Sequence, residues 1–235
     1  MAVALRHPTA PAGLTEFQLR RMVPMTQLAY PHARTQSGTT RASRSAPPRR
    51  PASVSDRLDP ETASHCRRVA WYAGGFAERL GLSEWEVETV RLGALMHDVG
   101  KVAVPIGLLH KVDPLVPAER TRLQEHPLHG AQIAASMGLS RPVQRIVRHH
   151  HERWDGTGYP DGLVGEDIPR LARIVTIVDT YDALLTPRSY QAARSTREVL
   201  EILEHEAGRM FDPELLEHFL VLMVSGRVGA GTAVA

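Results

Sequence analysis

The segment "IPRLARIVTIVDTYDALL" (168–185) decides between a helical fold and a mixed one. Its β-branched centre, "RIVTIV" (173–178), is compatible with a short buried strand. The apolar pattern nevertheless continues through "DTYDALL" (179–185) and stops only before Pro187, which is too long for an ordinary strand. We therefore interpret the segment as a buried helix.

The chain downstream of Asp56 carries helix signals at regular intervals. Ser83 is followed by Glu86, and Ser195 by Glu198, which is the spacing of a capping box. No segment shows strand alternation flanked by a hairpin turn. The other helices that we expect lie at 59–82, 83–100, 116–126, 127–138, 141–151, 195–208 and 212–226. The sequence therefore predicts an all-α bundle of about seven or eight helices.

The composition is that of a globular protein and excludes several classes. Of 235 residues, 43% are hydrophobic and 23% are charged, and the net charge of +2 is too small to hold a nucleic acid polymer. A single cysteine, Cys66, excludes a disulfide framework and favours a reducing compartment. We find no apolar run that would span a bilayer and no secretory signal, so we expect a cytoplasmic protein.

The two ends of the chain differ from its middle. The stretch "PHARTQSGTTRASRSAPPRRPASVS" (31–55) is rich in Pro, Ser, Thr and Arg and has little to bury. We predict a disordered N-terminal arm over 1–55, one domain over 56–225 and a flexible tail over 226–235. The arm is either a basic tail without a function or a segment whose arginines make a docking or membrane-surface contact.

Ligand-type residues interrupt several apolar helices. His97 and Asp98, in "LMHDVGK" (95–101), end an apolar helix, where burying both without partners would be costly. Asp179 lies within the apolar segment 168–185. A metal ion would stabilise these groups, because imidazole and carboxylate are its common ligands. The alternatives are ordinary surface or hydrogen-bonded histidines, and an ion pair of Asp179 with an arginine such as Arg173.

Two motifs carry a resemblance to a known family. "HDVGK" (97–101) and "HHERWDGTGYP" (150–160) strongly resemble the signatures of the HD-GYP family, a branch of the HD-domain metal-dependent phosphohydrolases. The similarity extends from about Asp56 to Pro213 and includes "DPETASH" (59–65), "EHPLHG" (125–130), "ARIVTIVDTYDAL" (172–184) and "FDPELL" (211–216). Both signatures in one helical chain are far more specific than an HD pair alone.

The resemblance implies a set of metal ligands and two or three divalent ions, with iron or manganese expected. In the family, the paired histidines directly precede the Glu of "HHE", which leaves His149 outside the set. Glu61, one helical turn before His65, matches an extra ligand that allows a third ion in some members. The implied ligands are Glu61, His65, His97, Asp98, His126, His150, His151 and Asp179.

The resemblance also implies the reaction, which is hydrolysis of cyclic di-GMP to linear pGpG and further to GMP. Two metals can share and activate a water, and the resulting hydroxide would attack phosphorus in line. Asp98 is the natural bridging ligand because a carboxylate has two oxygens. Lys101 would contact a phosphate oxygen as a point charge, although it is also placed to cap its helix. Asp98 and Lys101 are therefore the expected catalytic residues.

The loop after the paired histidines is expected to contact the substrate and, in the family, partner proteins such as cyclases. The sequence departs from the family after Asp179, where "RSYQ" (188–191) has Gln191 in place of a cation. The oligomeric state is left open, with a homodimer as one form. The residues expected to bind substrate are Lys101, Asp155, Gly158, Tyr159, Pro160 and Arg188. Asp155 is also placed to fix the loop by capping its backbone amides.

Three functions follow from these residues. The first is a cyclic di-GMP phosphodiesterase. The second is a catalytically weak receptor or interaction module, which Gln191 favours and the complete ligand set opposes. The third is an HD phosphohydrolase that acts on another cyclic dinucleotide.

Overall fold

The computed structural model describes residues 60–186 and 194–225, which belong to one structural unit. The predicted arm (1–55), the predicted tail (226–235) and Arg188 lie outside the described residues. Within these residues the regular structure is helical, apart from an isolated bridge between Ala207 and Phe211. The helices are α2 (Pro60–Arg79), α3 (Glu84–Met96), η2 (Val99–Ala103), α4 (Ile106–Leu109), α5 (Pro117–Gln124), α6 (His126–Ser136), α7 (Arg141–His149), η3 (Gly165–Asp167), α8 (Arg170–Leu185), α9 (Thr196–His205) and α10 (Pro213–Ser225). The predicted all-helical fold is confirmed.

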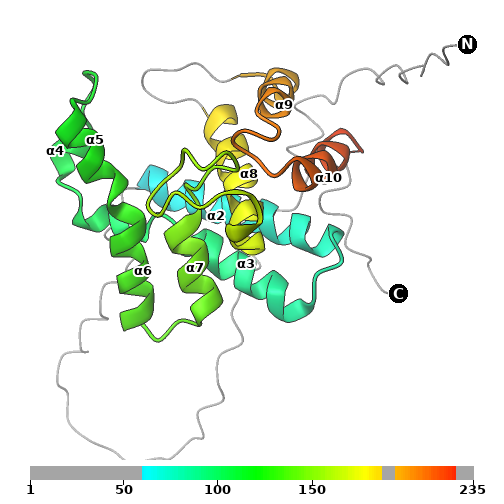
Figure 1. Cartoon of the computed structure of the whole chain (residues 1–235), viewed down its shortest axis with the longest axis horizontal. Helices are drawn as coiled ribbons and strands as arrows, with labels where there is room; N and C mark the ends of the chain where they lie inside the picture. Colours follow the sequence, from blue (N-terminus) through cyan, green and yellow to red (C-terminus); the bar gives the residue numbers. More distant parts are fainter. Residues whose placement is uncertain (1–59, 187–193, 226–235) are drawn as a thin grey trace, which may run out of the picture. The chain divides into compact units, whose positions relative to one another are not determined.

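Helix α8 explains why its sequence resembles a strand. Ile174, Val175, Ile177 and Val178 are all buried, and α8 contacts α2, α3, α7, α9 and α10. Figure 1 shows α8, in yellow, between α2 and α9. A helix that is covered on most sides needs apolar residues all round, so its sequence loses the usual polar face.

The predicted helix boundaries are correct where capping residues are present and shift elsewhere. Both predicted capping boxes form, with the Ser83 hydroxyl accepting from the Glu86 amide and Ser195 doing the same for Glu198. The helix predicted over 83–100 ends at Met96, and the chain continues after Asp98 as the 3-10 turn η2. The single-turn helix α4 was not predicted.

A close approach between η2 and α6 brings two parts of the site together. A Cβ atom at Gly100 would collide with the His126 carbonyl and lie 2.5 Å from the Gly130 nitrogen. Only glycine therefore allows η2 to lie against α6. This contact places Asp98, the residue before η2, next to His126, the first residue of α6. No helix in the described part of the chain is both long and apolar enough to span a membrane.

Candidate metal centre

Three buried histidines are oriented by carbonyls at the C-terminal ends of helices. The Nδ1 atoms of His97, His126 and His150 donate to the carbonyls three residues earlier, at 2.7, 2.8 and 2.9 Å. Those carbonyls belong to Ala94, Leu123 and Val147, each in the last turn of a helix, where main-chain acceptors lack an intrahelical donor. A carbonyl can only accept, so the proton of each neutral ring lies on Nδ1 and each Nε2 is a free acceptor.

These free acceptors converge on Asp98. The Nε2 atoms of His126 and His150 lie 3.4 Å apart, and Asp98 Oδ1 lies 3.5 Å from His126 Nε2. On the other side, Asp98 Oδ2 lies 3.4 Å from His97 Nε2, a buried atom without a hydrogen-bond partner. Acceptors that face one another in a buried site repel unless a cation lies between them.

The ligand-type atoms form two groups that share Asp98. One group contains Asp98, His126, His150 and His151, the other contains His65, His97 and Asp98, and within each the atoms lie within 4.8 Å of one another. Asp179 adjoins the second group, with its Oδ1 2.9 Å from His65 Nε2 and 3.7 Å from His97 Nε2. The structure thus brings together the expected ligands except one. Glu61 is exposed and belongs to neither group.

Burial keeps three of these imidazoles neutral, whereas at His65 and His97 the neighbouring carboxylates outweigh burial and raise the pKa, so these two sites favour a positive charge that a metal ion can supply. Burial holds the pKa of His150 well below its usual value, lowers that of His126 and lowers the pKa of His151 to about 4. Asp98 behaves in the opposite way: burial alone would raise its pKa, but Lys101 and His97 hold the pKa well below the usual value. Neutral imidazoles beside an ionised carboxylate are the protonation states that a divalent transition metal requires of its ligands. The donor set and the orphaned His97 Nε2 therefore fit a divalent metal centre.

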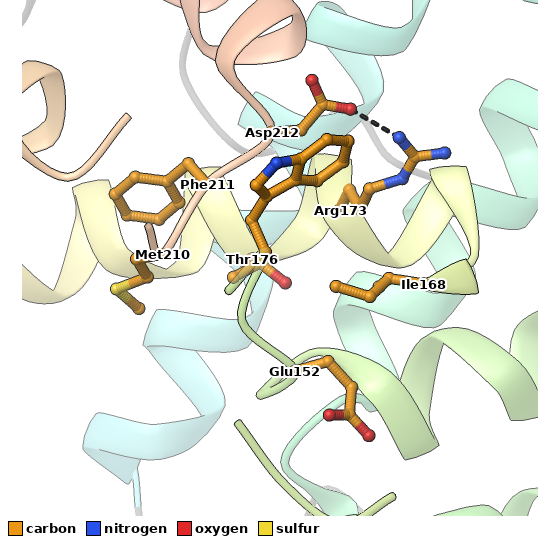
Figure 2. A pocket seen from close by; sticks show the side chains of 8 residues that line it. Glu152, Ile168, Arg173, Thr176, Met210, Phe211 and Asp212 are labelled. Carbon is orange, nitrogen blue, oxygen red and sulfur yellow. Dashed lines mark hydrogen bonds and ion pairs between the residues drawn. The ribbon is translucent and has the colours of Figure 1, made fainter. Parts of the chain in front are cut away.

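A charged pair behind His65 was not predicted. His65 Nδ1 lies 2.7 Å from Asp182 Oδ2, and Arg68 clamps the Asp182 carboxylate with two hydrogen bonds of 2.7 and 2.8 Å. The signal was present in the sequence, because Asp182 follows Asp179 by three residues in the same apolar helix. The suggested pair of Asp179 with Arg173 does not form; Arg173 pairs with Asp212 instead, as Figure 2 shows.

The loop after the paired histidines closes around a buried carboxylate. Glu152 accepts from the Asp161 amide at 2.8 Å and from the Leu163 amide at 3.1 Å, one with each oxygen. The loop is also tied to the segment before α10, because the amides of Trp154 and Asp155 donate to the carbonyls of Met210 and Arg209. The role of Glu152 was not foreseen, although the residue belongs to the "HHE" motif.

Of the residues expected to bind substrate, some lie beside the ligand groups and others shape the loop itself. Lys101 donates to Asp98 Oδ2 at 2.7 Å and remains partly exposed beside the ligand groups, and the Tyr159 ring lies 4.9 Å from the His151 ring. Asp155 instead caps its own loop, accepting from the amide and the hydroxyl of Thr157. Gly158 packs against the loop backbone, and Pro160 follows a cis peptide bond.

His149 points away from the two ligand groups. Its Nδ1 lies 3.6 Å from Glu152 and 3.5 Å from Asp161. Both carboxylates already accept shorter hydrogen bonds, Glu152 from loop amides and Asp161 from Arg148 at 2.7 Å. His149, Glu152 and Asp161 therefore form a separate cluster, which fastens the loop to α7.

A helical bundle with a buried His–Asp pair at its centre defines the class of protein. The HD domain family matches residues 52–215. The chain belongs to this family. The expected membership of the HD-GYP branch is confirmed by the relatives.

Two curated relatives and one solved structure illustrate the similarity. The chain is 41% identical over 165 residues (69% of this chain, 43% of the relative) to the cyclic di-GMP phosphodiesterase response regulator RpfG of Xanthomonas campestris pv. campestris (strain 8004). It is 40% identical over 162 residues (68% and 31%) to 3'3'-cGAMP-specific phosphodiesterase 2 of Vibrio cholerae serotype O1. An HDG"Y"P protein from Bdellovibrio bacteriovorus superposes with a TM-score of 0.57 at 25% identity, over 72% of this chain and 53% of that one. The chain spans less than half the length of these two curated relatives.

Proposed function

We propose that this chain is a metal-dependent phosphodiesterase that hydrolyses cyclic di-GMP to linear pGpG and further to GMP. The observation that carries the proposal is the convergence on Asp98 of three buried Nε2 atoms, each on a ring whose Nδ1 bonds a carbonyl, and Asp98 is shared by two ligand groups. The name of the relative at 41% identity supports the substrate.

The protein's own residues would divide the work between metal binding and substrate orientation. Divalent ions supply an activated water and positive charge at a phosphorus centre. Asp98 would serve both ion positions with its two oxygens, and Lys101 would orient a phosphate oxygen, since its ammonium is partly exposed beside Asp98. The residues that would hold the ions are His65, His97, Asp98, His126, His150, His151 and Asp179. The exposed Glu61 leaves two ions as the expected number.

We further propose iron or manganese as the metal, because imidazole and carboxylate ligands suit both. The reducing cytoplasm is the proposed location, because the single cysteine, Cys66, is free and buried. The proposed contact surface for cyclase-domain proteins is the loop 152–163, where Thr157, Asp161 and Gly162 are exposed.

A second substrate, 3'3'-cGAMP, has nearly equal support. The relative named for that substrate is 40% identical, against 41% for the relative named for cyclic di-GMP. Both substrates present the same phosphodiester to the metal centre and differ in one base. The choice between them depends on base contacts rather than on the ligand groups.

A competition assay tests both substrates. Full-length protein loaded with Mn²⁺ or Fe²⁺ receives equal amounts of the two cyclic dinucleotides, and chromatography follows the loss of each. We expect faster loss of cyclic di-GMP, with linear pGpG as the first product. Faster loss of 3'3'-cGAMP would reverse the preference, and no loss of either would refute the phosphodiesterase.

A matched pair of variants links activity to the ligand groups. Asp98→Ala should remove both the bound metal and the activity, because it deletes the carboxylate that both groups share. Asp113→Ala, at an exposed aspartate, should change neither. Elemental analysis and the same assay read the two effects, and an active Asp98→Ala variant would contradict the proposal.

A further inference from the structure

His65 is the one proposed histidine ligand that is held by a charged side chain in the described part of the chain. It lies inside α2, where main-chain carbonyls are used by the helix, and its Nδ1 reaches Asp182 Oδ2 in α8 at 2.7 Å. We infer that Asp182 is a positioning residue that fixes the His65 tautomer, and that it makes the two proposed ion positions unequal. The inference rests on the proposed metal centre and deepens it.

Arg68 keeps the Asp182 side chain as an ionised carboxylate, which can accept a hydrogen bond from His65 but cannot donate one. Arg68 Nε donates to Oδ1 at 2.7 Å, and its terminal nitrogen donates to Oδ2 at 2.8 Å. The same guanidinium also bonds Ser64 and Thr186. The carboxylate is therefore fixed in its plane, and the remaining acceptor site on Oδ2 faces the imidazole. With an ion bound, His65 would therefore keep its proton on Nδ1 and present Nε2 to that ion beside Asp179, whose Oδ1 lies 2.9 Å from Nε2.

The two ion positions differ in the group that accepts the hydrogen bond from Nδ1 of their histidines. Behind His126 and His150 stand neutral carbonyls. Behind His65 stands an ionised carboxylate, which makes an imidazole a stronger donor to a metal than a neutral acceptor does. The position of His65, His97 and Asp179 should therefore bind its ion more tightly than the position of His126, His150 and His151.

Two substitutions at Asp182 separate positioning from simple packing. Oδ2 accepts from both His65 and Arg68, so in Asp182→Asn an amide oxygen at that place keeps the His65 tautomer, and the NH₂ group faces Arg68 Nε. This variant removes the negative charge next to His65 and keeps the volume of the side chain. Asp182→Ala removes the acceptor and leaves a cavity. Positioning by an ionised carboxylate therefore predicts that both variants weaken metal binding, whereas a packing role predicts that Asn binds metal like the wild type and that only Ala is impaired.

A matched control exists elsewhere in the molecule. Asp212 is also buried and also pairs with an arginine, Arg173, as Figure 2 shows. It has no contact with either ligand group. Asp212→Asn therefore removes a buried ionic pair without changing any proposed ligand.

The experiment counts metal per folded chain. Each full-length variant is loaded with Mn²⁺, challenged with a competing chelator, recovered as the folded peak from gel filtration and measured by elemental analysis. We expect two ions in the wild type and in Asp212→Asn. Asp182→Asn should lose about one ion, as His65→Ala does, with an apparent Kd for that ion raised about 10- to 100-fold. Asp182→Ala should lose the same ion, because it removes the acceptor that holds His65.

The outcomes distinguish the inference from the proposed function. If Asp182→Asn keeps both ions as firmly as Asp212→Asn does, the positioning role is wrong and the metal centre stands. If the wild type binds no metal, the proposed function fails, and the inference fails with it. If Asp182→Asn does not fold, Asp182→Ala decides: retention of both ions as firmly as in Asp212→Asn contradicts the inference.

Discussion

At the scale of single residues, the site depends on where a helix ends. A carbonyl in a last turn has no intrahelical donor, so a histidine three residues later can satisfy it and direct its other nitrogen outward. His97, His126 and His150 all use this geometry. Each contact joins residues three apart, so the local sequence supplies both the acceptor for Nδ1 and the direction of each ring.

Gly158 is predicted to be as sensitive to substitution as a proposed metal ligand. A Cβ at Gly158 would collide with the Arg153 nitrogen and lie 2.6 Å from Glu152 Cα, both parts of the backbone that cannot move aside. We expect Gly158→Ala to destabilise the protein by about 1–3 kcal/mol, as overpacking does. Activity should fall with it, because Tyr159 contacts the His151 ring.

Gly107→Ala is the matched control, since a Cβ there meets nothing within 4 Å and the position is helical. Urea unfolding and the hydrolysis assay measure the two variants. Equal stability and activity of both would contradict the close packing of the loop.

At the scale of elements, the loop 152–163 is held in shape by hydrogen bonds to its own buried Glu152. Glu152 is almost fully buried and accepts one loop amide with each oxygen, while the loop backbone bonds residues 209–210. Such a loop has little freedom, although several of its side chains are exposed. It can therefore present a fixed surface beside the ligand groups.

Glu152→Gln should loosen this loop without unfolding the bundle. The Gln side chain can accept one of the two amides, and its NH₂ group must face the other, which leaves a buried donor unpaired at a cost of about 1–3 kcal/mol. We expect faster amide hydrogen exchange at Asp161 and Leu163, with little change in α2 or α3. Glu166→Gln, at an exposed glutamate, is the control and should exchange like the wild type. Unchanged exchange in Glu152→Gln would show that the loop is held by other contacts.

At the scale of the whole molecule, the ligand groups join segments that are distant in sequence. The proposed ligands come from α2, the α3–η2 junction, α6, the end of α7 and α8, and Figure 1 shows these helices around one region. Ions bound there would link five segments. Metal binding should therefore stabilise the fold as a whole.

Removal of metal is expected to lower the melting temperature. A ligand at 100 times its Kd adds about 2.7 kcal/mol, and each kcal/mol shifts Tm by about 2–4 °C at this chain length, which gives about 5–10 °C. Scanning calorimetry with and without a chelator measures the shift. His150→Ala should show a smaller shift, and a chelator without effect on the wild type would contradict a structural contribution from the ions.

The sequence by itself determined the helical class and the capping boxes at Ser83 and Ser195, and the family resemblance of its two motifs implied most of the residues that meet around Asp98. These features are local or follow from the motif, because capping depends on neighbours in the chain and a buried His–Asp pair requires a compensating cation. The sequence also predicted roles that remain proposals, among them the ligand roles and that of Lys101.

The tertiary structure alone decided which residues support the ligands and which lie outside the groups. Asp182 lies 117 positions from His65 in the sequence and reaches it only once α2 packs on α8. Arg68, in the same helix as His65, then holds Asp182. Glu61 has the right spacing from His65 yet is exposed, and Asp155 turns to its own loop. Spacing along a helix fixes the direction of a side chain, but what that side chain meets depends on the packing of distant segments.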